Sequence, residues 1–144
     1  MIYISHRGNT HGKLPSAENR PDYIDEAIWF GYDVEIDIWC KNDYLFLGHD
    51  SPEYPLNISW LSERSDKLWI HCKNIEAVEW FYMNKGFHYF WHDEDDMTMT
   101  SNGIIWSHPK IQPLINSIAV LPDTYEWDLS KCMGICSDYI EKYK

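Results

Sequence analysis

The alternation of predicted strands and helices limits the folds open to this chain more than any other feature. The order strand, helix, strand occurs twice before Asp93. Connections of this length join parallel strands, so the pattern predicts an α/β chain. The expected strands, bounded by turn residues, are Ile2–His6, Asp33–Trp39, Tyr44–Leu47, Leu68–Cys72, His88–His92, Gly103–Ser107, Ser117–Leu121 and Gly134–Ser137.

The predicted helices are recognised by the residues at their ends. Asn74 is a type that caps helix starts, and Gly31 and Gly86 are of the type that ends helices. After His88 the segments between predicted strands are too short for full crossover helices. The expected helices are Tyr23–Phe30, Ile75–Asn84 and a shorter one at Trp60–Arg64.

Composition and charge exclude several classes of protein. The 44% hydrophobic and 16% aromatic content excludes a disordered chain, and with no linker in sight residues 1–144 are expected to form one domain. The net charge of −11 opposes binding to nucleic acid or to an anionic membrane, because both require clustered Lys and Arg. No apolar run is long enough to span a bilayer and the first residues lack the features of a secretory signal, so we expect a cytoplasmic protein with reduced cysteines and no stable membrane insertion.

An acidic strand is the first candidate for chemistry. At the strand period of two, Asp33, Glu35 and Asp37 share one face, and Val34 and Ile36 share the other. Three crowded carboxylates raise one another's pKa values unless a cation neutralises them, and a divalent metal ion does so economically. The alternative is an edge strand with a solvated acidic face.

Basic and imidazole side chains lie near the ends of neighbouring predicted strands. His6 and His49 each follow a strand, and the carboxyl ends of parallel strands are where α/β folds bind ligands. His71 and Lys73 share one face of a further strand. Each of these residues alone is as readily a structural or solvated side chain, so the argument depends on their combination with the acidic strand.

The order of these motifs resembles a known family. The set His6-Arg7-Gly8, Glu18-Asn19, Gly31–Asp37, Asp43 and His49-Asp50 resembles the amino-terminal signature of the glycerophosphodiester phosphodiesterases, phospholipase-C-like phosphodiesterases built on a TIM barrel. Ile70–Lys73 is similar to the family's Glu-x-Lys strand, and Gly134–Asp138 is similar to its last barrel strand. A TIM barrel typically takes about 250 residues, so the resemblance implies a compact, reduced TIM (β/α) barrel with few or shortened outer helices.

The resemblance also implies an activity. It implies a metal-dependent phosphodiesterase that hydrolyses a small glycerophosphodiester or a related hydroxyl-bearing phosphodiester. An adjacent hydroxyl of the alcohol would attack first, and water would then open the cyclic phosphate. The implied roles are His6 and His49 as the general acid and base pair, Arg7 as the phosphate ligand held by Glu18, Lys73 facing the phosphate, and Glu35, Asp37 and His71 around the metal.

The identity of the metal depends on His71, which stands where the family has a glutamate. The resemblance implies calcium or magnesium, which prefer oxygen ligands. An imidazole nitrogen shifts the preference toward manganese or zinc. Trp39, on the face of Asp37, and Trp106 are the tryptophans expected to contact the substrate.

Two other functions compete with this one. A non-catalytic phosphate-binding or scaffold protein would keep the mouth of the barrel without turnover, but the presence of both histidines and both strand carboxylates favours an enzyme. A lipid-cleaving phospholipase would need an apolar or basic rim, which the net charge of −11 opposes. A homodimer that covers bare strands is a secondary expectation.

Overall fold

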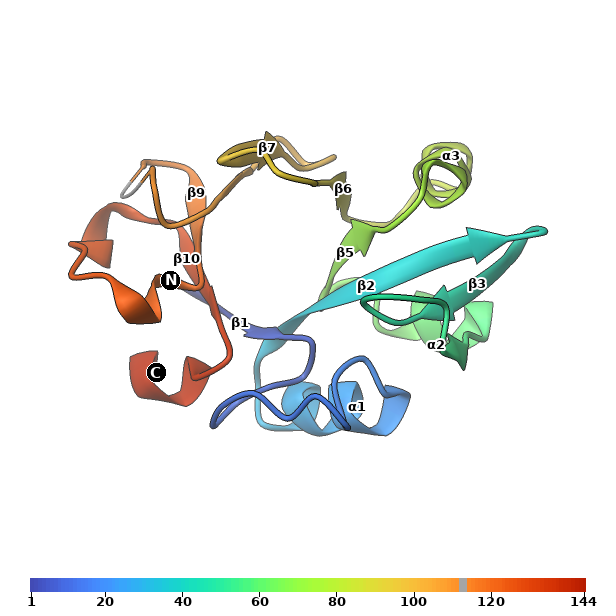
Figure 1. Ribbon diagram of the computed structural model, residues 1–144, viewed down its shortest axis with the longest axis horizontal. Helices are drawn as coiled ribbons and strands as arrows, with labels where there is room; N and C mark the ends of the chain where they lie inside the picture. Colours follow the sequence, from blue (N-terminus) through green and yellow to red (C-terminus); the bar gives the residue numbers. More distant parts are fainter. Residues whose placement is uncertain (112–113) are drawn as a thin grey trace.

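The computed structural model describes residues 1–111 and 114–144 (Figure 1). Its strands are β1 (Ile2–His6), β2 (Asp33–Lys41), β3 (Tyr44–Leu47), β4 (Tyr54–Pro55), β5 (Leu68–Cys72), β6 (Tyr89–Trp91), β7 (Met97–Met99), β8 (Ile105–Ser107), β9 (Ser117–Val120) and β10 (Gly134–Ser137). Its α-helices are α1 (Pro21–Trp29), α2 (Ile58–Glu63) and α3 (Ile75–Met83), and its 3₁₀ helices are η1 (Pro122–Thr124), η2 (Leu129–Lys131) and η3 (Ile140–Tyr143).

The strands form one mixed sheet of ten strands that curls around a central space (Figure 1). The run β6-β5-β2-β1-β10-β9-β8 is parallel throughout. β3 and β4 extend β2 as an antiparallel arm, and β7 pairs antiparallel with β8. The parallel run brings the carboxyl ends of these strands to the same end of the curled sheet.

The expectation of a reduced TIM (β/α) barrel is wrong. Among the described pairings, β6 pairs with β5 and β7 pairs with β8, and no ladder joins β6 to β7, so the sheet stays open. The α-helices in the described residues all precede β6, and 3₁₀ turns occupy the segments that follow β9 and β10. The chain is too short to place a crossover helix after every strand, and it forms a mixed, curled half-barrel instead of a helix-alternating closed barrel.

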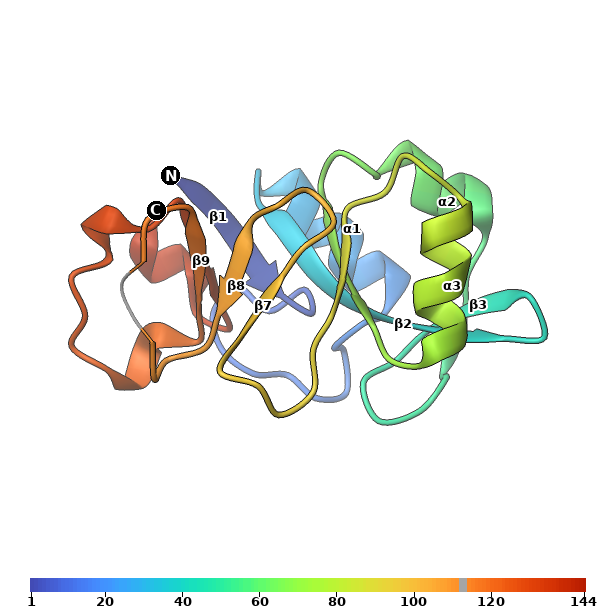
Figure 2. The ribbon, with the colours of Figure 1, turned by 90° about the horizontal axis from the view of Figure 1, so that it is seen from above.

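The helices cover one side of the curled sheet (Figure 2). α1 starts with Pro21 at its first turn, and the Asn74 side chain caps α3 by accepting a hydrogen bond from the Ala77 backbone N–H. Apolar side chains of these helices pack against the alternate residues of β2 and β5 that face away from the central space. This core includes Ile24, Ala27, Leu61, Phe81, Ile36 and Ile70.

A second apolar core lines the concave side of the sheet. Trp69, Phe90 and Trp106 pack there with Ile4 and Ile118. The ring centroids of Phe90 and Trp106 are 4.6 Å apart. This aromatic layer forms a floor for the polar residues at the carboxyl ends of the strands. Across the described ranges, no helix has both the length and the apolar character needed to cross a membrane.

Candidate functional site

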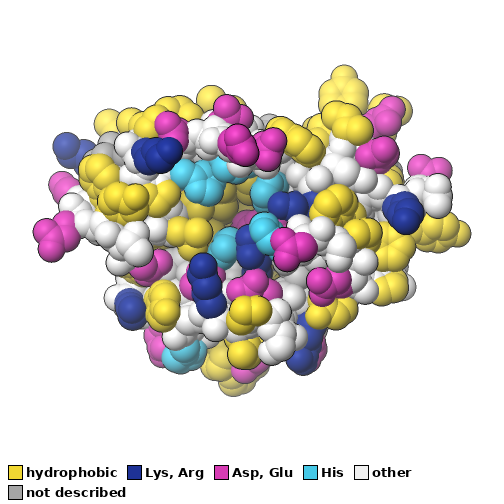
Figure 3. Space-filling view, viewed as in Figure 1, with side chains coloured by type: hydrophobic (Ala, Val, Ile, Leu, Met, Phe, Trp, Pro, Cys, Tyr) yellow, Lys and Arg dark blue, Asp and Glu magenta, His cyan; other side chains and the backbone are white. Residues whose placement is uncertain are grey.

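A cavity of about 530 Å³ opens at the carboxyl ends of the parallel strands. Figure 3 shows histidine side chains gathered around the hollow at the centre of this face, next to cationic and acidic side chains. Five of the seven histidines of the chain line the cavity. The lining residues are His6, Arg7, Lys13, Glu35, His49, His71, Lys73, His92, Asp93, Trp106, His108, Val120 and Leu121.

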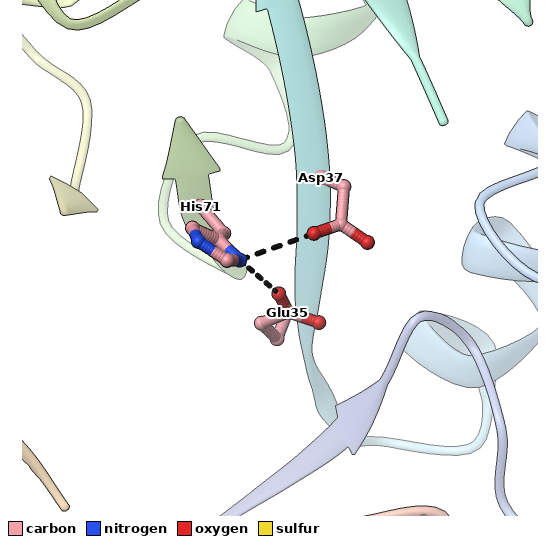
Figure 4. A group of neighbouring side chains, drawn as sticks. All are labelled: Glu35, Asp37 and His71. Atoms are coloured by element: carbon pink, nitrogen blue, oxygen red, sulfur yellow. Dashed lines mark ion pairs between the residues drawn. The ribbon is translucent and has the colours of Figure 1, made fainter. Parts of the chain in front are cut away.

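The strand register brings the acidic and imidazole residues together. Asp37 of β2 is the register partner of His71 in β5, and Glu35 is that of His6 in β1. His71 Nδ1 lies 3.1 Å from Asp37 Oδ1 and 3.6 Å from Glu35 Oε1 (Figure 4). One ligand atom from each of Glu35, Asp37 and His71 lies within 4.8 Å of the others. The predicted metal ligands therefore converge on one point.

Asp37 is fully buried at the centre of this site. Its Oδ2 lies 3.0 Å from Arg7 Nε and 3.3 Å from His49 Nδ1, and it accepts a 2.8 Å hydrogen bond from Asn19 Nδ2. Lys73 Nζ lies 3.8 Å from the other oxygen. Burial opposes the charge of Asp37, but the neighbouring His49 and His71 and the charge of Arg7 hold its pKa well below the usual range. Asp37 therefore stays ionised.

Two buried carboxylate oxygens in the site accept no hydrogen bond within the described residues, namely Glu35 Oε2 and Asp37 Oδ1. His71 Nε2 lies 2.9 Å from the His92 carbonyl oxygen, so this nitrogen carries the donated proton and Nδ1 faces the carboxylates. Carboxylate oxygens of Glu35 and Asp37 together with His71 Nδ1 form a mixed oxygen and nitrogen donor set that fits a divalent cation. Burial lowers the pKa of His71, but the negative charges of the nearby Asp37 and Glu35 outweigh it and raise this pKa to about 9, so a proton occupies Nδ1 when no metal is bound.

His6 is held by a carboxylate on its far side. His6 Nδ1 lies 2.8 Å from Asp138 Oδ1, and the same oxygen accepts a 2.8 Å hydrogen bond from Asn9 Nδ2. Burial raises the pKa of Asp138, but the hydrogen bond and charge of His6 and the Asn9 amide outweigh it and lower the pKa. The Nδ1 proton of His6 therefore points to Asp138. Its Nε2 lies on the side of Glu35, 3.8 Å from Oε2.

Arg7 contacts Glu18 on one side and Asp37 and His49 on the other. It has a φ of 57° and is followed by Gly8 at 93°, so the chain turns sharply after β1. The guanidinium donates to Glu18 Oε2 at 3.2 Å and to His49 Nε2 at 3.3 Å. Arg7 Nε makes an ion pair with Asp37 but is not aligned for a hydrogen bond with it. Glu18 lies outside the cavity lining and contacts Arg7.

The two tryptophans lie in different places. Trp106 is buried in the floor of the cavity. Trp39 lies outside it and lines a separate pocket with Asn42 and Pro52, where its Nε1 donates to the Gly48 carbonyl at 2.7 Å. The parallel ladder of β2 with β5 ends at Ile38, so Trp39 already belongs to the antiparallel arm. The expected contact of Trp39 with the substrate therefore has no basis in this geometry.

Some residues of the site were not predicted from the sequence as site residues. Asp138 follows the last strand, in the Gly134–Asp138 segment to which the resemblance assigned no catalytic or binding role. Asn9 and Asn19 are buried amides that hold charged residues in place, a role that a sequence pattern does not reveal. His108 follows Ser107 at the end of β8, so its position after a parallel strand was the available signal.

Comparisons with protein-family models, with curated proteins and with solved structures found no match. The cavity combines cationic side chains, a donor set for a metal ion and imidazoles with different hydrogen-bond partners. This combination can bind an anion and transfer protons beside it.

Proposed function

We propose that this protein is a metal-dependent phosphodiesterase that acts on a small, hydroxyl-bearing phosphodiester. The observation that carries the proposal is the pair of buried oxygens without hydrogen bonds, Glu35 Oε2 and Asp37 Oδ1, beside His71 Nδ1 in a cavity that also presents Arg7 and Lys73. Buried carboxylate oxygens are normally hydrogen-bonded or bound to metal. A bound divalent ion would neutralise charge on a non-bridging phosphate oxygen.

Arg7 and Lys73 supply the remaining positive charge for the phosphate. Arg7 presents a planar fork of donors, which suits two phosphate oxygens, and Glu18 fixes its orientation. Lys73 Nζ adds a point charge near the same carboxylate. These contacts orient the phosphorus toward the histidines that line the cavity.

His6 and His49 are the proposed proton-transfer pair. A free hydroxyl of one esterified alcohol attacks the phosphorus and gives its proton to one imidazole. The other imidazole protonates the oxygen of the second alcohol, which departs and leaves a cyclic phosphate. Water opens that ring with the roles reversed. Asp138 holds His6 with Nε2 on the cavity side. His49 is held between Arg7 and Asp37, and it becomes available when phosphate draws the Arg7 guanidinium away.

Activity of His6→Ala and His49→Ala on a glycerophosphodiester tests this assignment. Each variant should lose about 10²- to 10⁴-fold in turnover, the usual contribution of general acid–base catalysis. His11→Ala is the matched control, because His11 is exposed and pairs with Glu141 outside the cavity. Full turnover in both cavity variants would contradict the assignment.

The proposed metal site has a separate test. Metal-free protein should bind a divalent ion, and titration with Ca²⁺, Mg²⁺, Mn²⁺ and Zn²⁺ ranks the affinities. His71→Ala should weaken binding of manganese and zinc most, and His71→Glu should shift the preference toward calcium or magnesium. An unchanged ranking in His71→Ala would remove His71 from the ligand set.

A non-catalytic phosphate-binding protein is the second candidate. It is favoured by one observation, that both ring nitrogens of His49 are occupied by Arg7 and Asp37. Such a protein would bind inorganic phosphate in the cavity but would not cleave any ester in a panel of glycerophosphodiesters. Phosphate binding without turnover in the presence of each of the four metal ions therefore identifies this candidate.

A further inference from the structure

Three side chains with a fixed positive charge line the cavity, and one of them differs from the other two. Arg7 and Lys73 both contact the buried Asp37 and are only 18% and 16% exposed. The side chain of Lys13 is 66% exposed. In the part of the chain that the structure describes, its ion pair is with Asp138, with 3.8 Å between Nζ and Oδ2, which is too long for a hydrogen bond. Lys13 is therefore the cation that can change its partner.

Asp138 does not depend on this ion pair. Its Oδ1 accepts hydrogen bonds of 2.8 Å from Asn9 Nδ2 and from His6 Nδ1. Both donors remain in place when Lys13 moves away. The movement breaks one loose ion pair to an exposed ammonium group, and such pairs contribute little to stability.

The backbone on both sides of Lys13 is fixed. Gly12 has a φ of 138° and packs so closely on Tyr139 that a Cβ would lie 3.0 Å from a ring carbon. The Leu14 N–H donates to Asn9 Oδ1 at 3.1 Å. The Lys13 side chain lines the main cavity and also a second cavity of about 330 Å³ between this loop and α1. It thus extends from a fixed point and borders open space.

Lys13 and Lys73 border the cavity on different sides. Lys73 follows β5, whereas Lys13 lies beside Asp138, which follows β10. In the sheet, β5 and β10 flank the central pair of β2 and β1 (Figure 1). Arg7 follows β1 directly. A phosphate held by Arg7 therefore has Lys73 on the β5 side and Lys13 on the β10 side.

We propose that Lys13 is a further phosphate-binding residue, whose ammonium group leaves Asp138 and contacts a phosphate oxygen on the His6 side of the cavity. The inference rests on the phosphate site of the proposed function. The movement exchanges a loose ion pair for a charge-assisted hydrogen bond of about 2.8 Å. In a chain with a net charge of −11, an exposed cation that borders the cavity also offsets the repulsion of an entering anion.

Calorimetric binding of inorganic phosphate to the full chain tests the inference. It is measured in EDTA and again with Mn²⁺, at ionic strengths of about 0.02 and 0.2 M, which span weak and strong screening. Lys13→Met keeps most of the apolar stem and removes the charge, and Lys13→Arg restores a charge. Urea unfolding of each variant reports any structural effect.

The matched control is Lys110→Met. Lys110 resembles Lys13 in exposure, at 75%, and in its loose ion pair, with Nζ 3.6 Å from Asp96 Oδ1. However, Lys110 does not line the cavity. Its replacement changes the net charge by the same amount, so it measures the effect of overall charge alone.

We expect Lys13→Met to weaken phosphate binding by about tenfold at low ionic strength, the usual worth of a hydrogen bond to a charged group. The loss should be smaller at high ionic strength, because salt screens an exposed charge. Lys13→Arg should recover most of the affinity. Lys110→Met should bind phosphate as the parent does, and the urea midpoint of Lys13→Met should not change.

Unchanged phosphate affinity in Lys13→Met overturns the inference, and so does an equal loss in Lys110→Met. A loss that comes with a lower urea midpoint and is not recovered in Lys13→Arg identifies a structural role and also overturns it. Turnover of a glycerophosphodiester by the parent separates this inference from the proposed enzyme. Phosphate binding that depends on Lys13, without turnover, contradicts the enzyme and supports the role of Lys13, whereas a parent that binds no phosphate contradicts both.

Discussion

His71 and His108 line the same cavity, yet their protonation is opposite. The pKa of His71 is raised to about 9, and that of His108 is lowered to about 4. Burial disfavours the charged form of both rings. The difference lies in the neighbours, because His71 faces Asp37 and Glu35 at 3.1 and 3.6 Å, whereas His108 stacks on another imidazole. Nearby carboxylates, more than burial, decide which wall of this cavity carries charge.

Removal of the charge of Asp37 should have the largest effect. Asp37→Asn should lower metal affinity by at least about 100-fold, because a ligand is lost. It should also destabilise the metal-free fold by about 3 kcal/mol, because buried cationic groups lose their main counter-ion. Metal titration and urea unfolding measure the two effects.

Asp33→Asn is the control for this prediction. Asp33 lies on the same face of β2 but pairs with the half-exposed Lys67 outside the cavity. We expect a loss of about 1 kcal/mol or less and unchanged metal affinity. If the two variants behaved alike, the central role of Asp37 would be wrong.

The second prediction concerns alkaline pH. The folded-state pKa of His71, about 9, lies above its ordinary value of 6.5. A raised pKa stabilises the fold fully below pH 6.5, and this stabilisation is lost as the pH rises through 9. Metal-free protein should therefore lose stability, by up to about 3 kcal/mol, across this interval.

Urea unfolding of parent and His71→Gln in EDTA measures the loss. The variant should show a flatter alkaline profile. Saturating metal should flatten the profile of the parent too, because the metal takes the place of the proton on Nδ1. Parallel profiles for parent and variant in EDTA would show that the proton on His71 is not stabilising.

A third prediction sharpens the comparison on the acid side. The pKa of His108 is lowered from 6.5 to about 4, so the unfolded chain binds a proton on this residue before the folded protein does. Stability from this group is present above pH 6.5 and is lost as the pH falls through 4. His108→Phe should therefore lose less stability on acidification than the parent, as measured by urea unfolding. An acid profile as steep as that of the parent would contradict this.

The smallest effect is expected at Trp39. Trp39→Phe removes the hydrogen bond to the Gly48 carbonyl and should cost about 1 kcal/mol of stability. Affinity for phosphate and for glycerol phosphate should not change, because Trp39 lies outside the cavity. A clear loss of affinity for glycerol phosphate alone would restore the substrate contact expected from the sequence.

Local patterns predicted much of this architecture. The bounds of β1, β3, β5 and β10 agree with the sequence pattern, and the alternation in β2 places Glu35 and Asp37 on one face. Such features depend on strand period and on turn residues next to the strand. The convergence of these carboxylates with His71 follows from the parallel register.

Features that depend on the course of the whole sheet were not predicted. The resemblance implied a reduced TIM barrel. Closure of such a barrel would depend on pairing between β6 and β7, which are short strands outside the motifs that carry the resemblance. β4 and β7 are too short to give an alternation signal. Trp39 was misplaced because β2 continues beyond its parallel ladder into an antiparallel arm.

The open seam between β6 and β7 also has a mechanical consequence. His92 follows β6, and His108 follows β8, the strand that pairs with β7, so their stacked rings span the seam. A backbone hydrogen bond from Ser101 N, after β7, to Tyr89 O in β6 also connects the two sides of the seam. Without a ladder to break, the borders can separate at a low free-energy cost. We therefore expect the cavity to change width most readily at this seam, and the backbone amides along it should exchange with solvent through local opening before the rest of the sheet does.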